Sequence, residues 1–189
     1  MDAFSFVFSL FGLLMGLALA EAISGFGKAL EMRHRIRIGW LLPLLALLIT
    51  FDITSLWLIA WQSRSAIPIS FISLAAGLVI FGMYYLIAQL AFPDDVERWP
   101  DLDAYYFKHR RWLMGGMYTC NLLAMGGEQA IGIPQLATPN QWIVFLAFSA
   151  GVAGVCFLPG RALNMAALIY QLCLYPLFDA LGVMSRSWF

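Results

Sequence analysis

Six apolar stretches follow one another along this chain and leave little room for any other structure. They cover residues 4–30, 40–61, 68–92, 112–133, 142–158 and 161–186. A helix needs about 20 apolar residues to cross the hydrocarbon core of a bilayer. Hydrophobic residues make up 62% of the chain and charged residues only 12%, a composition far from that of soluble globular domains. We therefore predict an all-α integral membrane protein, with one transmembrane domain over residues 1–189 built as a six-transmembrane-helix bundle.

The basic residues of the chain are unevenly distributed between the two sides of such a bundle. If the N-terminus lies outside, the outer segments contain only Arg64 and Arg186, while the inner loops contain eight basic residues: Arg33, Arg35, Arg37, Arg98, Lys108, Arg110, Arg111 and Arg161. Cytoplasmic loops of membrane proteins carry this kind of excess. We predict that both termini are extracytoplasmic (N-out/C-out), in the plasma membrane, which is the inner membrane if the cell is bacterial.

The same basic loops suggest which partners the chain has. Basic residues next to a membrane attract anionic lipid head groups by about 1 kcal/mol each, so the lipid bilayer is the expected partner and nucleic acid is not. Tyrosines and tryptophans near the ends of the apolar stretches, such as Trp40, Trp61 and Tyr84, are typical of membrane-interface anchors. Stripes of small residues in two helices favour close helix contacts and predict a homo-oligomer.

A polar stripe runs along the last apolar stretch. Its members recur at steps of seven, four, four and seven residues: Asn164, Gln171, Tyr175, Asp179 and Arg186. This spacing places all of them on one face of a helix. Because an unpaired polar group in hydrocarbon costs several kcal/mol, the stripe must face water or polar groups of other helices.

The depth of each polar residue follows from the helical rise of about 1.5 Å per residue. Counted from the inner interface, Asp52, Asn121 and Gln171 lie about 14 to 18 Å deep, near the middle of a core about 30 Å thick. Glu128 and Asp179 lie about 24 to 27 Å from the inner face by the same count. The sequence thus permits a discontinuous line of polar groups across the membrane.

Such a line favours a path for protons or cations. An intramembrane carboxylate is stabilised either by protonation or by pairing with a cation. Asp52 is the best candidate for a titrating group, because no lysine or arginine is predicted at its depth, whereas Glu21 lies near Lys28. We expect a channel or transporter for protons, cations or a small solute. Asp52 would be its central site, with Glu21, Glu128 and Asp179 as vestibule groups and Asn121, Gln171 and Tyr175 as the lining.

Two other functions remain open from the sequence. Polar side chains also hold membrane helices together without further activity, so the chain could be a non-catalytic subunit or scaffold. It could also be an enzyme that acts on lipid through Asp101 and Asp103 in its longest loop. No cofactor is expected: both histidines lie in basic turns rather than inside the bundle, nucleotide-binding loops are missing, and the acidic residues of the loop lack the spacing of a metal site.

Overall fold

The computed structural model describes residues 3–95 and 98–180, and this part of the chain is helical, with no β-strand. Its helices are α1 (Ala3–Glu31), α2 (Leu41–Gln62), the short 3-10 helix η1 (Ser63–Ser65), α3 (Phe71–Ala91), α4 (Leu102–Ala130), α5 (Pro139–Phe157) and α6 (Arg161–Ala180). Four of them, α1, α2, α3 and α5, are long and apolar enough to cross a membrane. The all-α class is confirmed, and these helices indicate a membrane-embedded protein. α4 and α6 are long enough, but charged and polar residues lower their hydropathy.

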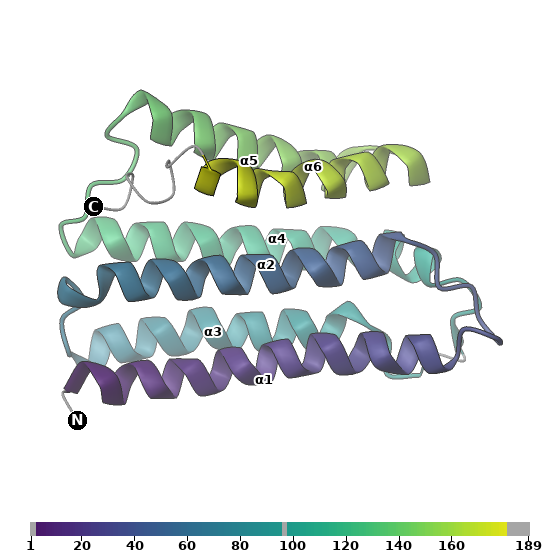
Figure 1. The fold of residues 1–189 in the computed structure, drawn as a ribbon, viewed down its shortest axis with the longest axis horizontal. Helices are drawn as coiled ribbons and strands as arrows, with labels where there is room; N and C mark the ends of the chain where they lie inside the picture. The colour runs from purple at the N-terminus through teal and green to yellow at the C-terminus, as the bar shows by residue number, and fades with distance from the viewer. Residues whose placement is uncertain (1–2, 96–97, 181–189) are drawn as a thin grey trace.

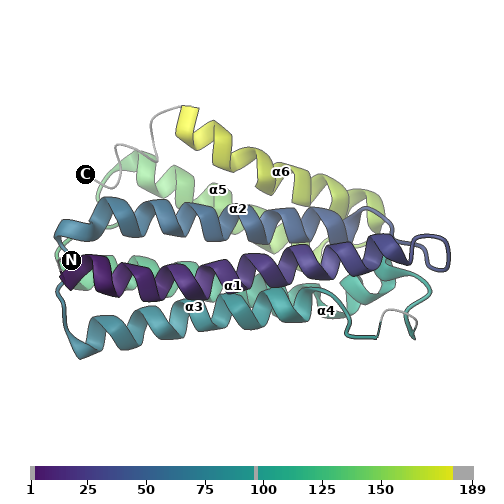
Figure 2. The same cartoon turned by 60° about the horizontal axis from the view of Figure 1, so that its bottom comes forward.

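The helices lie side by side along one common direction, as Figures 1 and 2 show. α2 and α4 contact each other at the centre, with the pair α1 and α3 on one side and the pair α5 and α6 on the other. We call the end that holds the α1–α2, α3–α4 and α5–α6 connections the basic end. The opposite end holds the α2–α3 and α4–α5 connections (Figure 1). α2 therefore packs against helices from both halves of the chain.

The core between the central helices is apolar towards the basic end. Leu45 and Leu48 of α2 and Met114 of α4 are completely buried, and Leu168 of α6 packs among them with no exposed surface. The large apolar side chains that remain exposed, such as Ile72, lie on the outer surfaces of the helices. This distribution suits a bundle surrounded by hydrocarbon rather than by water.

The observed helix ends agree with most predicted boundaries. The sequence Pro100-Asp101 predicts a helix start near Asp101, ahead of the apolar stretch. α4 does begin directly after Asp101, because the Asp101 side chain accepts the N–H of Asp103 at 2.9 Å and caps the helix. α5 begins at Pro139, before the predicted residue 142, because Thr138 and Gln141 form a capping box. The sequence Pro93-Asp94-Asp95 also predicts the start of a short surface helix, but residues 96–97 of that segment lie outside the described residues, as does the end of the last helix at Arg186.

Two aspartates connect the starts of three helices at the basic end. Asp101 and Asp103 of the α4 start both pair with Arg161 at the start of α6, with Asp103 at 3.2 Å. Asp103 also accepts the backbone N–H of Leu41 at the start of α2, at 3.3 Å. These contacts fix the positions of α2, α4 and α6 along their axes. They thereby align the polar residues that lie further along the three helices.

We expect Gly39→Ala to destabilise this junction by about 2 kcal/mol or more. Gly39 has a φ of +67°, and a Cβ there would overlap the carboxylate of Asp103. A side chain in this conformation costs about 1 to 2 kcal/mol, and disturbing a cap adds about 1 kcal/mol. The measurement is the thermal unfolding midpoint in detergent. Gly27→Ala is the control: it lies in α1 with open space around it, so it should not lower the midpoint, and equal midpoints for both variants would contradict this account.

Candidate functional site

A buried carboxylate, that of Asp52, lies at the centre of a hydrogen-bond network between four helices. Asp52 of α2 is 1% exposed. Its Oδ2 accepts the hydroxyl of Tyr84 (α3) at 2.5 Å and the side-chain amide of Asn121 (α4) at 2.9 Å. Its Oδ1 accepts the hydroxyl of Tyr175 (α6) at 2.7 Å. Three residues that the sequence predicted as pathway residues, Asp52, Asn121 and Tyr175, are thus brought together.

All three partners of Asp52 are neutral hydrogen-bond donors. No lysine or arginine in the described part of the chain forms an ion pair with this carboxylate. Asn121 also contacts the Tyr84 hydroxyl at 3.1 Å, so the donors are connected to one another. Three donors can occupy three of the roughly four lone-pair positions of a carboxylate. The site can therefore hold a negative charge or a proton without help from a basic side chain.

Tyr84 is a member of this network that the sequence analysis misassigned. It was interpreted as an interface anchor, but it is completely buried, so that interpretation is wrong. Tyr84 lies eight positions before Phe92, the C-cap of α3, which is about 12 Å at the helical rise. The same depth count that placed Asp52 and Asn121 near the middle would have placed Tyr84 there too.

A pocket extends from Asp52 towards the opposite end of the bundle. It has a volume of about 150 Å³ and lies between α2, α4, α5 and α6. Its polar lining consists of Asp52, Ser55, Asn121, Glu128, Gln135 and Gln141, together with the hydroxyls of two tyrosines. On α4 the lining residues from Asn121 to Glu128 span seven positions, or about 10 Å along the helix. The pocket thus connects the central carboxylate with a second one near the α4–α5 loop.

Glu128, the second carboxylate, is also held by neutral donors. Its side chain accepts the hydroxyl of Ser63 at 2.6 Å and the side-chain amide of Gln135 at 3.2 Å, and only 7% of the residue is exposed. Ser63 lies in η1, between α2 and α3, and Gln135 lies in the α4–α5 loop. The sequence analysis predicted neither of them as a site residue. Asp52 and Glu128 therefore mark the two ends of one pocket, as the sequence analysis allowed.

Gln171 lies one turn from Tyr175 towards the basic end, and it is not part of the pocket surface. It is completely buried, and its amide has no hydrogen-bond partner among the described residues. Gly151 of α5 makes room for it, because a Cβ at Gly151 would overlap the amide oxygen. An unpaired buried amide costs about 1 to 3 kcal/mol of stability, so Gln171 in this position is unfavourable for the folded state.

A second polar cluster lies nearer the basic end. Asn164 of α6 accepts both the Tyr106 hydroxyl, at 3.0 Å, and the guanidinium of Arg110, and it donates to the carbonyl of Leu158 at 2.7 Å. Arg110 also donates to that carbonyl at 2.8 Å and is 7% exposed. The sequence analysis counted Arg110 among the basic residues of an inner loop. The structure corrects this: Arg110 lies on the side of α4 that faces the bundle and is buried there.

The two remaining predicted pathway residues, Glu21 and Asp179, do not line the pocket. Glu21 is half-buried on α1, a helix that packs against α2 and α3 on the other side of the bundle. Asp179 is exposed near the end of α6, and its predicted partner Arg186 lies outside the described residues. Their place on a pathway stays a prediction.

No group of three or more His, Cys, Asp or Glu side chains that could hold a metal ion occurs within residues 3–95 and 98–180. Comparison of the chain with models of known protein families, with curated proteins and with solved structures finds no match. The arguments for a function therefore come from the pocket and its chemistry.

Proposed function

We propose that this chain is a small polytopic membrane transporter that moves protons, cations or a small solute, with Asp52 as its central binding group. One observation carries the proposal: a pocket leads from the loop region at the opposite end to a buried carboxylate that lacks a basic partner among the described residues. Ionisable groups at this depth are expensive to place in a membrane. Because the Asp52 carboxylate lines a pocket, a role in binding explains it better than a role in helix packing alone.

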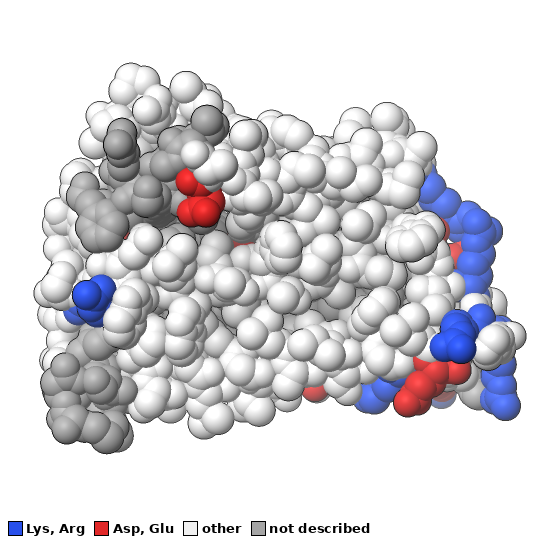
Figure 3. All heavy atoms as spheres, in the orientation of Figure 1, with Lys and Arg blue, Asp and Glu red and all other residues white. Residues whose placement is uncertain are grey.

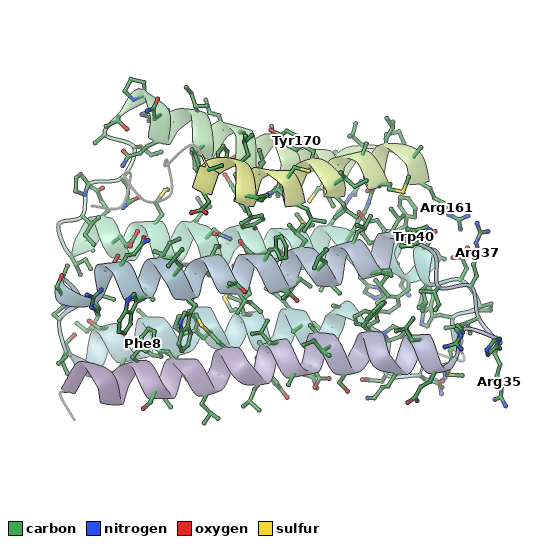
Figure 4. All side chains as sticks on the ribbon, in the orientation of Figure 1. Phe8, Arg35, Arg37, Trp40, Arg161 and Tyr170 are labelled. Carbon is green, nitrogen blue, oxygen red and sulfur yellow. The ribbon has the colours of Figure 1, made fainter. Side chains whose placement is uncertain are left out.

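We further propose that all six helices cross the membrane, with both termini extracytoplasmic. α6 has 20 residues and α4 has 29, enough for about 30 Å or more at the helical rise. Lys and Arg gather at the basic end while the flank of the bundle is mostly free of charge (Figure 3). Arg35, Arg37 and Arg161 reach out from that end (Figure 4). An excess of positive charge favours the cytoplasm, so the pocket would open to the outside.

The inner half of the bundle supports a transporter over an open channel. Between the Asp52 network and the Asn164 cluster, buried apolar residues such as Leu48, Met117 and Leu168 fill most of the space. Gln171, the buried polar residue at this level of α6, is packed against Gly151 of α5. Ions do not cross a closed apolar layer, so movement to the inside requires a change in helix packing. A conducting channel would instead need a wet path at this level.

α6 contains a feature that would permit such a change. Pro176 lies inside the helix, directly after Tyr175. Because proline has no N–H, the carbonyl of Leu172 loses its usual helical partner and the helix can bend there. A bend would move Tyr175 relative to Asp52. Release of the bound species towards the inside could follow from that movement.

The test is ion flux into liposomes that contain the purified chain, read with a pH-sensitive dye at a set membrane potential, in the presence of protons and potassium. We expect flux above that of empty liposomes, and a decrease of about tenfold or more in Asp52→Asn, because hydrogen bonds to a charged group contribute about 1.5 to 3 kcal/mol. Thr54→Val is the matched control. Thr54 is exposed on the same helix, and among the described residues its hydroxyl bonds only to the Thr50 carbonyl, at 2.8 Å.

Equal flux in wild type and Asp52→Asn would remove Asp52 from the mechanism. The absence of flux for either ion, with correctly inserted protein, would favour the scaffold function or the transport of a solute other than these two ions. The enzyme alternative has little support, because Asp101 and Asp103 are engaged in helix capping and ion pairs. Homo-oligomerisation and the plasma membrane location stay predictions.

A further inference from the structure

The pocket has a size that limits its occupant. Its volume of about 150 Å³ equals that of cavities which hold a molecule such as benzene. Ligand sites for drug-sized molecules are larger, about 300 to 1,000 Å³. The occupant is therefore a small molecule or a single ring with a short substituent.

The charges around the pocket favour a cation. Asp52 and Glu128 line its two ends, and none of the described lining residues is a lysine, arginine or histidine. Within the described part of the chain, all hydrogen bonds to the two carboxylates come from neutral side chains. Oδ1 of Asp52 accepts one bond, from Tyr175, while Oδ2 accepts two. A carboxylate oxygen has about two lone-pair positions, so Oδ1 keeps one for a further donor.

Aromatic side chains form a large part of the pocket wall: Tyr118, Phe145, Phe148, Tyr175 and Phe178. The rings of Phe148 and Tyr175 are perpendicular with centroids 6.5 Å apart, and those of Phe148 and Tyr118 are stacked at 6.3 Å. Aromatic faces attract ammonium groups, by about 0.5 to 2 kcal/mol. The same rings can pack against an apolar body.

The remaining wall disfavours a bare inorganic ion. Leucine, isoleucine, valine and methionine side chains complete it, including Leu56, Ile59 and Met125. Hard cations such as calcium and magnesium need about six or more oxygen ligands around one point, whereas the oxygen-bearing side chains of this pocket are divided between its two ends, about 10 Å apart along α4. An organic ammonium ion satisfies both the acidic and the apolar surfaces.

We propose that this pocket binds a small organic cation: a protonated amine on an apolar body about the size of one aromatic ring, with the ammonium group at Asp52. The proposal rests on the proposed transport function, because it names the substrate class of the same pocket. The ammonium N–H donates to Oδ1 of Asp52, and the body lies against Phe148 and its neighbours. Glu128 attracts the cation at the other end of the pocket.

Binding of three probes of similar size to the purified full chain in nanodiscs tests the proposal. The probes are benzylamine (protonated at neutral pH), benzyl alcohol and benzoate, measured by calorimetry with protein-free nanodiscs subtracted. We expect saturable binding of benzylamine at least about tenfold tighter than that of the other two. Equal or tighter binding of benzyl alcohol or benzoate, or no saturable binding of benzylamine, would overturn the proposal. These wild-type measurements do not depend on whether a variant folds.

Variants then locate the bound cation. Glu128→Gln and Asp52→Asn should each weaken benzylamine binding about tenfold or more, while Thr119→Val should leave it unchanged. Thr119 is exposed on α4, and its hydroxyl bonds to the Gly115 carbonyl at 2.8 Å. Unchanged binding in both carboxylate variants would refute this site. Asp52-dependent proton flux without benzylamine binding would refute the ligand class alone. Binding of benzylamine without flux of protons, potassium or benzylamine itself into the same liposomes would refute only the transport function.

Discussion

Ser55→Phe should reduce ion flux to the level of empty liposomes. Ser55 lines the pocket one turn from Asp52, and its hydroxyl donates to the Asp52 backbone carbonyl at 2.8 Å. Among the described residues its hydroxyl bonds to no other helix, so its replacement leaves the Asp52 network intact. A phenyl ring fills a cavity of about 150 Å³. In the liposome assay described for Asp52→Asn, flux should therefore stop because the phenyl ring fills the pocket, although the Asp52 carboxylate is still present.

Leu58→Phe is the control for this prediction. Leu58 lies on the same helix and is 41% exposed, on a surface that faces lipid in the proposed topology. The added ring should leave flux and thermal stability near the wild-type values. If Ser55→Phe stays folded, as judged by its thermal midpoint, and conducts as wild type does, the pocket is not the pathway.

The depth count explains why part of this site was predictable. Asp52 and Asn121 belong to different helices, yet counting residues from one interface placed both near the same level, and the structure joins them at 2.9 Å. Helices in a bilayer run between two fixed planes, so position along the helix translates into height. Tyr84 lies at a comparable depth, about 12 Å from the inner end of α3, so the same count identifies it as a residue of this level. Which residues face each other across the bundle depends on helix rotation, which the count does not give.

Helix packing also explains what was not predictable at the basic end. Arg110 and Arg111 are neighbours in one basic run, and the sequence alone predicts the same environment for both. In the structure Arg110 is 7% exposed and bonded to Asn164, while Arg111 is exposed and lies over the ring of Phe157. The difference arises because α4 extends beyond the apolar stretch and turns one side of its first turns towards α6. Glu21 was predicted as a vestibule group, but its helix packs against α2 and α3, and Glu21 does not line the pocket.

Asn164→Leu should lower the free energy of unfolding by about 3 kcal/mol or more. Asn164 is completely buried, and it accepts bonds from both Arg110 and Tyr106. Leucine has a similar volume but accepts no hydrogen bond. The Arg110 guanidinium would then be buried without its side-chain acceptor, and the Tyr106 hydroxyl would be unpaired. Each unsatisfied buried group costs about 1 to 3 kcal/mol, and a charged group costs more. Unfolding in mixed detergent measures the change.

Two further variants separate the buried charge from simple loss of packing. Asn140→Leu makes the same substitution at an exposed position in the first turn of α5, where changes stay within about 0.5 kcal/mol. The double variant Asn164→Leu with Arg110→Leu should be more stable than Asn164→Leu alone, because removing both partners of a buried polar pair is far less costly than removing one. If the second substitution instead lowers stability further, the cost lies in packing between α4 and α6. The Asn164 cluster would then stabilise the inner end of the bundle through side-chain packing. The burial of Arg110 would not require its hydrogen bond to Asn164.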